Sequence, residues 1–542
     1  MSATPASHAA SAADQITQGH TSLGIELGST RIKACLVGAD PSQVLAVGDF
    51  EWENQLVDGL WSYSLDEVWT GLQTAFAALV ADAQERHGVR PTTFGAIGMS
   101  AMMHGYLAFD GSDELLVPFR TWRNTSTGPA AAELTKEFGV NIPLRWSIAH
   151  LYQAVVDQEP HVSEVSFVTT LAGYVHWRLT GERVLGVGDA SGMFPIDDAT
   201  RTYDVTMAAR FDELSAARPL HPGASLTELL PAVLPAGAAA GILTSEGAAL
   251  LDPTGALQPG ILFCPPEGDA GTGMVATNSV APREGNVSAG TSIFAMVVLE
   301  RALKEVHDEL DVVTTPAGDP VAMVHCNNGA SELAAWVGIF RQFADAASLT
   351  LSADDAYRAL FTAALDGEPD AGGILAYNQL AGEPIAGVDD GRPLVVRTND
   401  SDFSLGNLMR AQIYGVFATL SLGMAVLDEE GVVLDRMFAH GGVFRTGGVA
   451  QRFLAASLKV PVSVAETASE GGAWGIAVLA AYARAVASGD PKTLPDFLTN
   501  SVFANAAVTT ADPTPDDIAG FATYLDRYRA GLVIERAAGH AL

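Results

Sequence analysis

Residues 23–37 read LGIELGSTRIKACLV, and this stretch determines the fold that we predict. Two apolar runs in it flank a polar turn, which is the pattern of a strand, a tight turn and a second strand. Residues 286–299, NVSAGTSIFAMVVL, repeat the pattern. The two turns consist of Gly28, Ser29 and Thr30, and of Gly290, Thr291 and Ser292. Because the repeats stand at corresponding places in two halves of the chain, we expect two similar lobes, with a nucleotide in the cleft between them.

The segment after the first repeat predicts a helix and then another strand. Ser64 and Glu67 have the spacing of a capping box, and the apolar residues that follow keep helical spacing as far as Gly88. Residues 94–99 then form a short apolar run that ends at Ser100. Because strands alternate with helices, the sequence predicts an α/β fold.

The length of the chain, 542 residues, exceeds what one hydrophobic core supports. We therefore expect two large domains with short additions at each end. The expected parts are a disordered tail over 1–20, an N-terminal lobe over 21–284, a C-terminal lobe over 285–490 and a partly helical extension over 491–542.

Composition excludes several classes of function. The formal net charge is −33, which disfavours a nucleic-acid or anionic-membrane surface, and no apolar run reaches the ~18–20 residues of a membrane span. The first twenty residues lack the features of a signal or transit peptide, so we expect a cytoplasmic protein. Cys35, Cys264 and Cys326 lie far apart, which favours buried free thiols in a reducing compartment and excludes a cysteine zinc site.

Two nucleotide motifs are absent or incomplete. No GxxxxGK[ST] sequence occurs, so the P-loop class is excluded. Residues 271–276 match a dinucleotide-binding GxGxxA pattern, but acidic residues stand in the preceding turn and no acidic ribose ligand follows. Asp269 lies in that glycine-rich turn, before a helix of small residues. It could accept the proton of an alcohol during phosphoryl transfer, or it could simply be the N-cap of the helix.

Seven segments, taken in order, resemble the FGGY family of carbohydrate kinases. They are LGIELGSTRIKACLV (23–37), IGMSAMMHGYLAFD (97–110), YVHWRLTGE with GDASGMF (174–194), PEGDAGTG (266–273), VSAGTSIF (287–294), LAGE (380–383) and AHGGVFRTGGVAQRF (439–453). Their order and spacing are more specific than any single segment. The resemblance implies an α/β fold with two actin-like (ribonuclease H-like) lobes of the sugar kinase/Hsp70/actin type, and ATP in the interlobe cleft.

The resemblance also implies roles for individual residues. Asp269 stands at the position of the catalytic base and would contact the sugar. Glu26 and Asp269 would hold Mg²⁺, and Met103, His104 and Trp122 would line the sugar pocket, although core packing is an alternative for His104 and Trp122. The residues that would hold ATP are Gly28, Ser29, Thr30, Gly290, Thr291, Ser292, Gly441 and Gly442. A plain loop is the alternative for the last two.

The Met103-His104-Gly105 turn is most similar to that of xylulose kinases. We therefore expect transfer of the γ-phosphoryl of Mg-ATP to a terminal hydroxyl of a ketopentose, xylulose first, in pentose catabolism. Two departures from the family pattern bear on this: Glu26 replaces the usual Asp, and residues 122–126 lack the usual carboxylate and arginine. L-Ribulose, another ketose or a polyol stays an alternative substrate, and a non-catalytic sugar or nucleotide sensor is an alternative of another class. The sequence leaves the stereoisomer and the oligomeric state open, with a homodimer as one candidate, and gives no role to 491–542.

Overall fold

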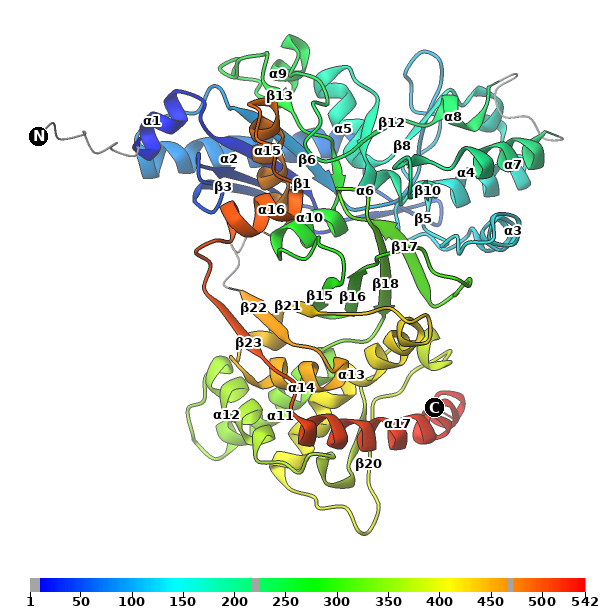
Figure 1. Cartoon of the computed structure of the whole chain (residues 1–542), viewed down its shortest axis with the longest axis vertical. Coiled ribbons are helices and arrows are strands. Elements are labelled where there is room, and N and C mark those ends of the chain that lie inside the picture. Colours follow the sequence, from blue (N-terminus) through cyan, green and yellow to red (C-terminus); the bar gives the residue numbers. More distant parts are fainter. Residues whose placement is uncertain (1–9, 217–223, 466–470, 542) are drawn as a thin grey trace, which may run out of the picture. The chain divides into compact units, whose positions relative to one another are not determined.

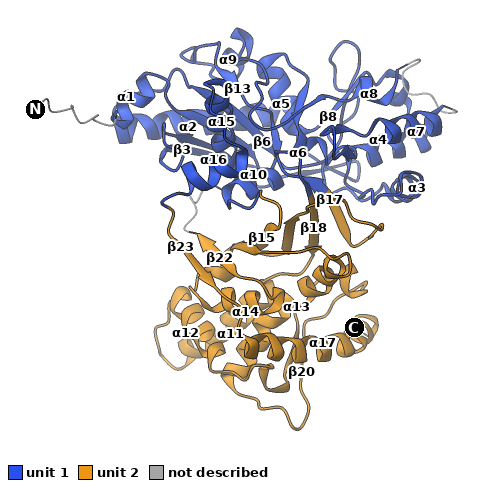
Figure 2. Cartoon of the chain, in the orientation of Figure 1, with its two compact units in different colours: residues 1–280, 313–320, 467–505 blue, residues 281–312, 321–466, 506–542 orange. Residues whose placement is uncertain are grey.

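The computed structural model describes residues 10–216, 224–465 and 471–541 (Figure 1). The chain divides into two compact units that are not continuous in sequence (Figure 2). Unit 1 comprises residues 1–280, 313–320 and 467–505, and unit 2 comprises residues 281–312, 321–466 and 506–542. The units therefore differ from the consecutive lobes expected from the sequence, because residues 467–490 belong to unit 1 and most of the C-terminal extension belongs to unit 2.

The core of unit 1 is a sheet in the order β13-β6-β1-β2-β3, with β14 also paired to β6. Its strands are β1 (Ser22–Leu27), β2 (Arg31–Val37), β3 (Val44–Glu51), β6 (Ala96–Ala101), β13 (Leu262–Phe263) and β14 (Glu267–Gly268). The predicted hairpin is present as the antiparallel pair β1 and β2, and β6 runs parallel to β1. The predicted α/β class is confirmed.

Two helices cover opposite faces of this sheet, α2 (Leu65–His87) and α15 (Gly472–Ala487). Gly48 faces α2, because a Cβ on it would lie 2.2 Å from the carbonyl oxygen of Ala75. Gly24 faces α15, because a Cβ there would lie 2.3 Å from the carbonyl oxygen of Ala473. The contact of α15 with β1, β2 and β6 explains why this helix belongs to unit 1.

Smaller elements complete unit 1. The helices are α1 (Ala12–Thr17), α3 (Gly128–Phe138), α4 (Ser147–Val156), α5 (Leu171–Thr180), α6 (Val187–Ala190), α7 (Val205–Ser215), α8 (Leu226–Leu229), α9 (Ser245–Leu251), α10 (Asp269–Ala276) and α16 (Leu494–Phe497). The short strands are β4 (Gln55–Val57), β5 (Leu60–Ser62), β7 (Leu107–Phe109), β8 (Phe167–Thr169), β9 (Val184–Gly186), β10 (Ile196–Asp197), β11 (Thr202–Tyr203) and β12 (Ala232–Leu234).

Two local expectations differ from the structure. Helix α1 lies inside the stretch expected to be disordered, because Ser11 and Asp14 form a capping box and Ile16 is buried; residues 1–9 lie outside the described residues. The capping box expected at Ser64 is absent from the described start of α2, where Ser64 makes no side-chain cap. Glu67 instead accepts a hydrogen bond from Gln55, at 3.1 Å.

Unit 2 is built on a seven-stranded sheet in the order β17-β18-β16-β15-β21-β22-β23. Its strands are β15 (Glu284–Ala289), β16 (Ile293–Val298), β17 (Leu310–Thr314), β18 (Pro320–Cys326), β21 (Arg436–His440), β22 (Val462–Ala465) and β23 (Val508–Ala511). The second predicted hairpin is the antiparallel pair β15 and β16, and β21 runs parallel to β15. Each unit therefore carries a hairpin with a parallel strand beside its first strand.

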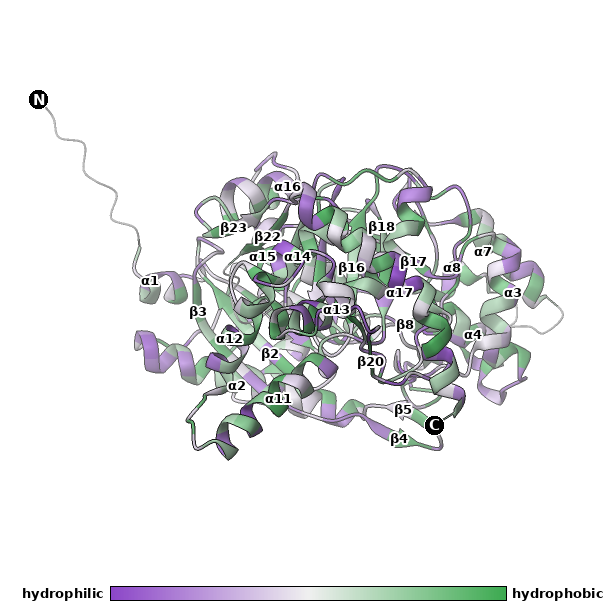
Figure 3. Cartoon of the chain, turned by 90° about the horizontal axis from the view of Figure 1, so that it is seen from below, coloured by the Kyte–Doolittle hydropathy of each residue, from purple (hydrophilic) through white to green (hydrophobic). Residues whose placement is uncertain are grey.

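The helices of unit 2 enclose a second core. They are α11 (Ser331–Ala346), α12 (Ala353–Leu365), α13 (Leu405–Glu429), α14 (Val449–Leu458) and α17 (Pro515–Ala541), and a small sheet holds β19 (Leu375–Tyr377) and β20 (Leu394–Val396). Helix α13 is long and apolar enough to cross a membrane, but 78% of its apolar window is buried, as in a core helix. Figure 3 shows hydrophilic and hydrophobic residues mixed along α2 and α11, as expected for helices that cover a core on one side only.

An ion pair with a buried aspartate attaches the C-terminal helix to this core. Arg452 of α14 donates to both carboxylate oxygens of Asp517, at 2.6 and 3.0 Å, and Asp517 is 1% exposed. Arg410 of α13, also buried, lies 3.7 Å from the same carboxylate. Helix α17 is thus an integral part of unit 2.

Candidate active site

The carboxyl ends of the parallel strands in unit 1 bring polar residues together at one edge of the sheet. Glu26 of β1 is in register with Ser100 of β6, and Glu267 of β14 is in register with the same serine. The Ser100 hydroxyl lies 3.3 Å from that of Thr272 in α10. Because ligands of open α/β sheets bind at the carboxyl ends of strands, this edge is the candidate site of unit 1.

Asp269 is fixed at this edge as the first residue of α10. Its Oδ1 accepts hydrogen bonds from the backbone N–H groups of Met103, at 3.1 Å, and Ala270, at 2.9 Å. The N-cap of α10 is Gly268, so the alternative role of Asp269 as N-cap is wrong. The side chain reaches solvent, yet surrounding protein raises the pKa of the carboxyl above its usual value, and the backbone hydrogen bonds only partly offset this. The group is therefore accessible, oriented and more basic than an ordinary aspartate.

Glu26 lies near Asp269 and is half-buried. Burial, followed by the negative charge of Asp269, raises the pKa of Glu26 to about 7, while Lys33 and the N–H of Ala473 lower it. The described residues contain no group of three or more His, Cys, Asp or Glu side chains arranged to hold a metal. Two carboxylates still fit Mg²⁺, which is usually held by one or two carboxylates together with substrate phosphates and water.

The turn that follows β6 places the predicted sugar-contacting residues. His104 has a left-handed backbone, with φ of 70°, and is buried. Its Nδ1 donates to the carbonyl of Gly192, at 3.1 Å, and its ring stacks on Trp146. Burial lowers the pKa of His104 to about 3, so the imidazole is neutral at physiological pH. Met103 is also mostly buried.

Trp122 lies in the loop beside this turn and is 39% exposed, which is unusual for a tryptophan. The backbones of Tyr106 and Arg120 form an antiparallel bridge, and His104 and Trp122 each lie two residues from it. The side chain of Asn124 holds the loop by exchanging hydrogen bonds with the backbone of Trp61, both at 2.8 Å. The structure thus brings the two predicted sugar-contacting segments together, and their contact with a sugar stays a prediction.

The turn of the first hairpin is fixed by aromatic side chains. Trp52 donates from Nε1 to the carbonyl of Gly28, at 2.7 Å, and the hydroxyl of Tyr63 donates to the carbonyl of Ser29, at 2.6 Å. Thr30 is exposed at the tip. A turn whose carbonyls are held in place can present its N–H groups and hydroxyls in a defined direction, as phosphate binding requires.

Unit 2 contains an open pocket of about 920 Å³ around the second hairpin. It is lined by Ala289, Gly290, Thr291, Ala330, Ser331, Leu333, Ala334, Ala353, Asp354, Tyr357, Arg358, Phe361, Thr362, Gly442, Val443, Arg445, Thr446 and Gly447. The hairpin adjoins the start of α11, where the N–H of Ala330 donates to the carbonyl of Gly290, at 2.8 Å. Turn N–H groups beside a helix N-terminus favour phosphate, and the volume is that of a typical ligand pocket.

The predicted glycine pair has two different roles. Gly442 lines the pocket and a Cβ on it would meet no atom within 4 Å. Gly441, with φ of 108°, approaches the hairpin instead, because a Cβ there would lie 2.2 Å from the carbonyl oxygen of Ala289. Packing against the hairpin thus explains why position 441 is a glycine, and contact of the pair with ATP stays a prediction. Gly441 and Ser292 are not among the residues that line the pocket.

Comparison with known proteins identifies the family. Residues 21–258 match the N-terminal domain of the FGGY family of carbohydrate kinases, and residues 285–484 match the C-terminal domain of the same family. The chain belongs to the FGGY family of carbohydrate kinases. The resemblance expected from the seven segments, the kinase class and the two-domain fold are thereby confirmed.

The curated relatives of this FGGY kinase are distant. It is 27% identical to a xylulose kinase of Klebsiella pneumoniae over 39% of this chain and 44% of that protein. It is 20% identical to a xylulose kinase of Haemophilus influenzae over 78% of this chain and 82% of that protein. The chain thus matches less than half the length of the first relative and most of the second.

Solved structures confirm the fold. The structure of xylulose kinase from Rhodospirillum rubrum aligns with a TM-score of 0.76 at 20% identity, covering 96% of this chain and all of that one. That of gluconate kinase from Lactobacillus acidophilus aligns with a TM-score of 0.74 at 16% identity, covering 95% of this chain and 99% of that one. Because proteins named for different substrates align almost equally well, the likeness shows the fold of the FGGY kinase and leaves its substrate open.

Two acidic residues at the site were missed by the sequence analysis. Asp189 is fully buried; its Oδ2 accepts from the Thr170 hydroxyl, at 2.6 Å, and its Oδ1 has no partner among the described residues. Burial raises the pKa of Asp189 to about 7. Glu267, also buried, accepts from the N–H of Asp189, at 2.9 Å, and burial raises its pKa well above the usual value. Both residues lie in segments that resemble the family, but nothing in their local sequence predicts that they meet.

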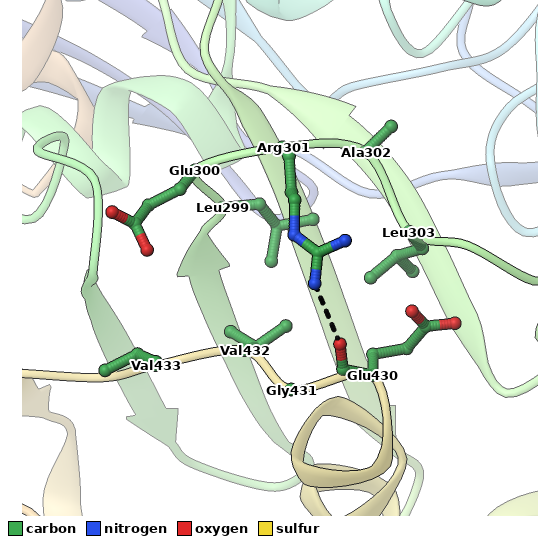
Figure 4. Close-up of a pocket in the computed structure, with 9 residues that line it drawn as sticks. All are labelled: Leu299, Glu300, Arg301, Ala302, Leu303, Glu430, Gly431, Val432 and Val433. Atoms are coloured by element: carbon green, nitrogen blue, oxygen red, sulfur yellow. Dashed lines mark hydrogen bonds between the residues drawn. The ribbon is translucent and has the colours of Figure 1, made fainter.

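A smaller pocket in unit 2 is structural. The loop after β16 meets the end of α13 there, and the space between them is about 30 Å³, the volume of one water molecule (Figure 4). The Arg301 guanidinium points to the carbonyl of Glu430 and donates to it, at 3.3 Å. The carboxylate of Glu430 accepts from the N–H groups of Lys304 and Glu305, both at 3.0 Å, and pairs with His307. These contacts hold a loop and leave no room for a substrate.

Proposed function

We propose that this FGGY kinase transfers the γ-phosphoryl of ATP to a terminal hydroxyl of a ketopentose, with xylulose as the first candidate. The observation that carries the proposal is the direct hydrogen bond from the N–H of Met103 to Asp269. It ties the carboxylate suited to accept a proton to the turn that holds the predicted sugar-contacting residues. The names of the curated relatives support xylulose over other sugars.

In the proposed reaction, the carboxylate of Asp269 accepts the proton of the sugar hydroxyl as that oxygen bonds to the γ-phosphorus. The bond between the γ-phosphorus and its bridging oxygen breaks, and ADP leaves. The raised pKa of Asp269 suits a base that must hold a proton during the transfer. Such a transfer depends mainly on positioning and charge, which the fixed turns of the two hairpins would provide for the phosphates.

The metal has a limited part in the proposal. Glu26 and Asp269 would hold Mg²⁺ together with the phosphates of ATP and water. Bound there, the ion would neutralise charge on the phosphates. Glu26 replaces the shorter aspartate of the family pattern. Burial is the main cause of its raised pKa of about 7, and the negative charge of Asp269, which adds to it, would favour a divalent cation between the two carboxylates.

The cellular setting follows from composition and burial. All three cysteines are buried and none of them forms a disulfide in the described part of the chain, which suits a reducing compartment. We propose a cytoplasmic enzyme whose partners are ATP and the sugar.

A coupled assay of ADP release tests the proposal over a panel of pentuloses, hexuloses, polyols and aldonates. We expect the highest kcat/KM with xylulose. A clear preference for ribulose, for a polyol or for gluconate would show that the proposed substrate is wrong, whereas the proposed phosphoryl transfer would stand. Binding of sugar and ATP without ADP release from any of them would overturn the reaction and favour a sensor.

A further inference from the structure

A largely buried network of polar side chains includes residues of both predicted sugar-contacting segments of unit 1. Arg120 forms a two-pronged ion pair with Glu159, in which Nη1 donates to Oε1 at 3.0 Å and Nη2 donates to Oε2. The Tyr106 hydroxyl hydrogen-bonds to Nε2 of His161, at 2.9 Å, and Nδ1 of His161 lies 3.4 Å from the Glu159 carboxylate. The four side chains thus form one connected group.

The same residues form the bridge between the two segments. The N–H of Tyr106 donates to the carbonyl of Arg120, at 2.8 Å, and the N–H of Arg120 donates back, at 3.2 Å. The Arg120 guanidinium also lies over the Tyr106 ring, 5.4 Å from its centre. Because His104 precedes Tyr106 by two residues and Trp122 follows Arg120 by two, a shift of this bridge would move both.

The composition of the network favours function over stability. Nε of Arg120 and both ring nitrogens of His150, which stacks on Tyr106, are buried without partners among the described residues. Unpartnered buried polar groups carry an energetic cost. Local costs of this kind are typical of functional sites.

We propose that Arg120 and Glu159 are positioning residues for the sugar, whose ion pair holds His104 and Trp122 in the geometry that binds it. This inference rests on the proposed function, since it assumes that those two residues contact the substrate. The ion pair would thus influence sugar binding although neither of its residues is proposed to contact the sugar or the nucleotide. The hydrogen bond between Tyr106 and His161 supports the Arg120–Glu159 ion pair, because the His161 ring also lies beside the Glu159 carboxylate.

The test is Arg120→Lys, which keeps the charge but loses the planar fork that bonds both carboxylate oxygens. Sugar kcat/KM should fall by roughly tenfold to 100-fold, mainly through KM, because a small misplacement of binding groups is costly. The KM for ATP should stay within about twofold, since neither Arg120 nor Glu159 is among the residues proposed to hold ATP or among those that line the pocket of unit 2. Glu159→Gln should act in the same direction, and the double variant should be little worse than either single variant because both break one interaction.

The matched control is Arg452→Lys, which alters an arginine that also binds both carboxylate oxygens, in unit 2. It should lower the melting temperature and leave the sugar KM unchanged. An unchanged sugar KM in folded Arg120→Lys and Glu159→Gln enzymes, or an equal rise in the control, would overturn the inference. If Arg120→Lys does not fold, Glu159→Gln decides, because Glu159 is only half-buried.

The wild-type enzyme in the same assay tests the proposed function separately. If another sugar is the substrate, the comparison is made with that sugar. If none is turned over, the proposed function fails, and titration calorimetry of the wild-type and variant proteins with xylulose decides whether Arg120 affects sugar binding.

Discussion

Two pairs of acidic side chains, one pair in each unit, are held in opposite ways. At the sheet edge of unit 1, burial and the charge of Asp269 outweigh the effect of Lys33 on Glu26 and of the Thr170 hydrogen bond on Asp189, so the pKa of each rises to about 7. In unit 2, burial alone would raise the pKa of Asp517, but hydrogen bonds from Arg452 and Thr514 lower it below its usual value. Glu430 is hydrogen-bonded by His307 and by backbone N–H groups, which lower its pKa to about 2.

The difference separates groups kept for chemistry from groups kept for stability. A carboxyl whose pKa is raised by folding is less favourable as an anion in the folded state than in the unfolded chain, so its charge opposes folding. A carboxyl whose pKa is lowered is stabilised as an anion by folding. Substitution of a carboxyl with a raised pKa should therefore lower activity and leave stability unchanged. Substitution of a carboxyl with a lowered pKa should lower stability and leave activity unchanged.

Asp269→Asn should show the largest effect. Loss of the general base should lower kcat by roughly 10²–10⁴, while the KM for ATP should change little, because the proposed partner of the carboxylate is the sugar hydroxyl and Glu26 remains to hold Mg²⁺. The melting temperature should stay the same or rise, since the variant removes a charge that burial disfavours. Steady-state kinetics and a thermal melt together check this, and near-wild-type turnover would remove Asp269 from the mechanism.

Asp517→Asn should be the opposite case. It leaves Arg410 buried without its counter-charge, a type of change that costs about 3–5 kcal/mol of stability. Chemical denaturation should show this loss, whereas kcat per folded molecule should remain close to wild type. A drop in kcat without a drop in stability would contradict the contrast between the two pairs of acidic residues.

His104→Ala tests whether a polar but uncharged side chain of unit 1 contributes to sugar binding. If the imidazole hydrogen-bonds a sugar hydroxyl, its loss leaves that hydroxyl unpaired, at a cost of about 1–3 kcal/mol, or roughly a 5- to 150-fold fall in kcat/KM. The loss should be large for the true substrate and small for poor ones. Because burial lowers the pKa of His104 to about 3, no titration of this residue should appear between pH 5 and 9.

The control for this prediction is a melting curve of the same variant. Equal loss for every sugar, together with a lower melting temperature, would show that His104 supports the core instead. The assignment of the sugar pocket would then rest on Met103 and Trp122.

Glu26→Gln should raise the Mg²⁺ concentration needed for half-maximal rate, by roughly tenfold to 100-fold if the carboxylate belongs to the metal site. Its effect on stability follows from the pKa. The folded-state pKa of about 7 exceeds the unfolded value of 4.5, so the stability contributed by protonation is lost as pH rises through 7. The variant should therefore melt higher than wild type at pH 8 and not at pH 4. A rise in sugar KM with unchanged Mg²⁺ dependence would place Glu26 in the sugar pocket.

Glu430→Gln should have the smallest effect, confined to stability. The folded-state pKa of about 2 lies below the unfolded value of 4.5, so the contribution of Glu430 is present above pH 4.5 and is lost as pH falls toward 2. The variant should melt lower than wild type at pH 7 and lose less stability on acidification. Thermal melts between pH 2 and 7 measure both, and identical acid profiles would show that Glu430 contributes nothing.

The sequence predicted the parts of the fold that depend on local pattern. Both hairpins, the helix that ends at Gly88 and the strand after it are present, because alternation and turn chemistry act over a few residues. The capping box at Ser64 failed because Gln55, from a neighbouring strand, competes for Glu67. The place of α15 in unit 1 was not predicted, because it depends on contacts with β1, β2 and β6, which lie far from it in the sequence.

The candidate site, too, could be predicted from the sequence only where local motifs mark its residues. Asp269, Gly290, Thr291 and Gly442 could be chosen by their place in ordered motifs, and the structure puts the last three around one pocket. Glu267 and Asp189 could not be chosen from the sequence, since their raised pKa values result from burial and from the meeting of two distant segments. Trp122 was singled out by resemblance alone, and its exposure became known only from the structure.

The place of α15 on the sheet of unit 1 also affects how the chain folds during synthesis. Strands β1 and β6 emerge from the ribosome early, but the helix that covers one of their faces ends at residue 487. That face therefore stays bare while all of the first part of unit 2 is made, on the order of tens of seconds at usual elongation rates. We therefore expect an N-terminal fragment that ends near residue 284, and so lacks α15, to be less soluble than the full chain when it is expressed alone.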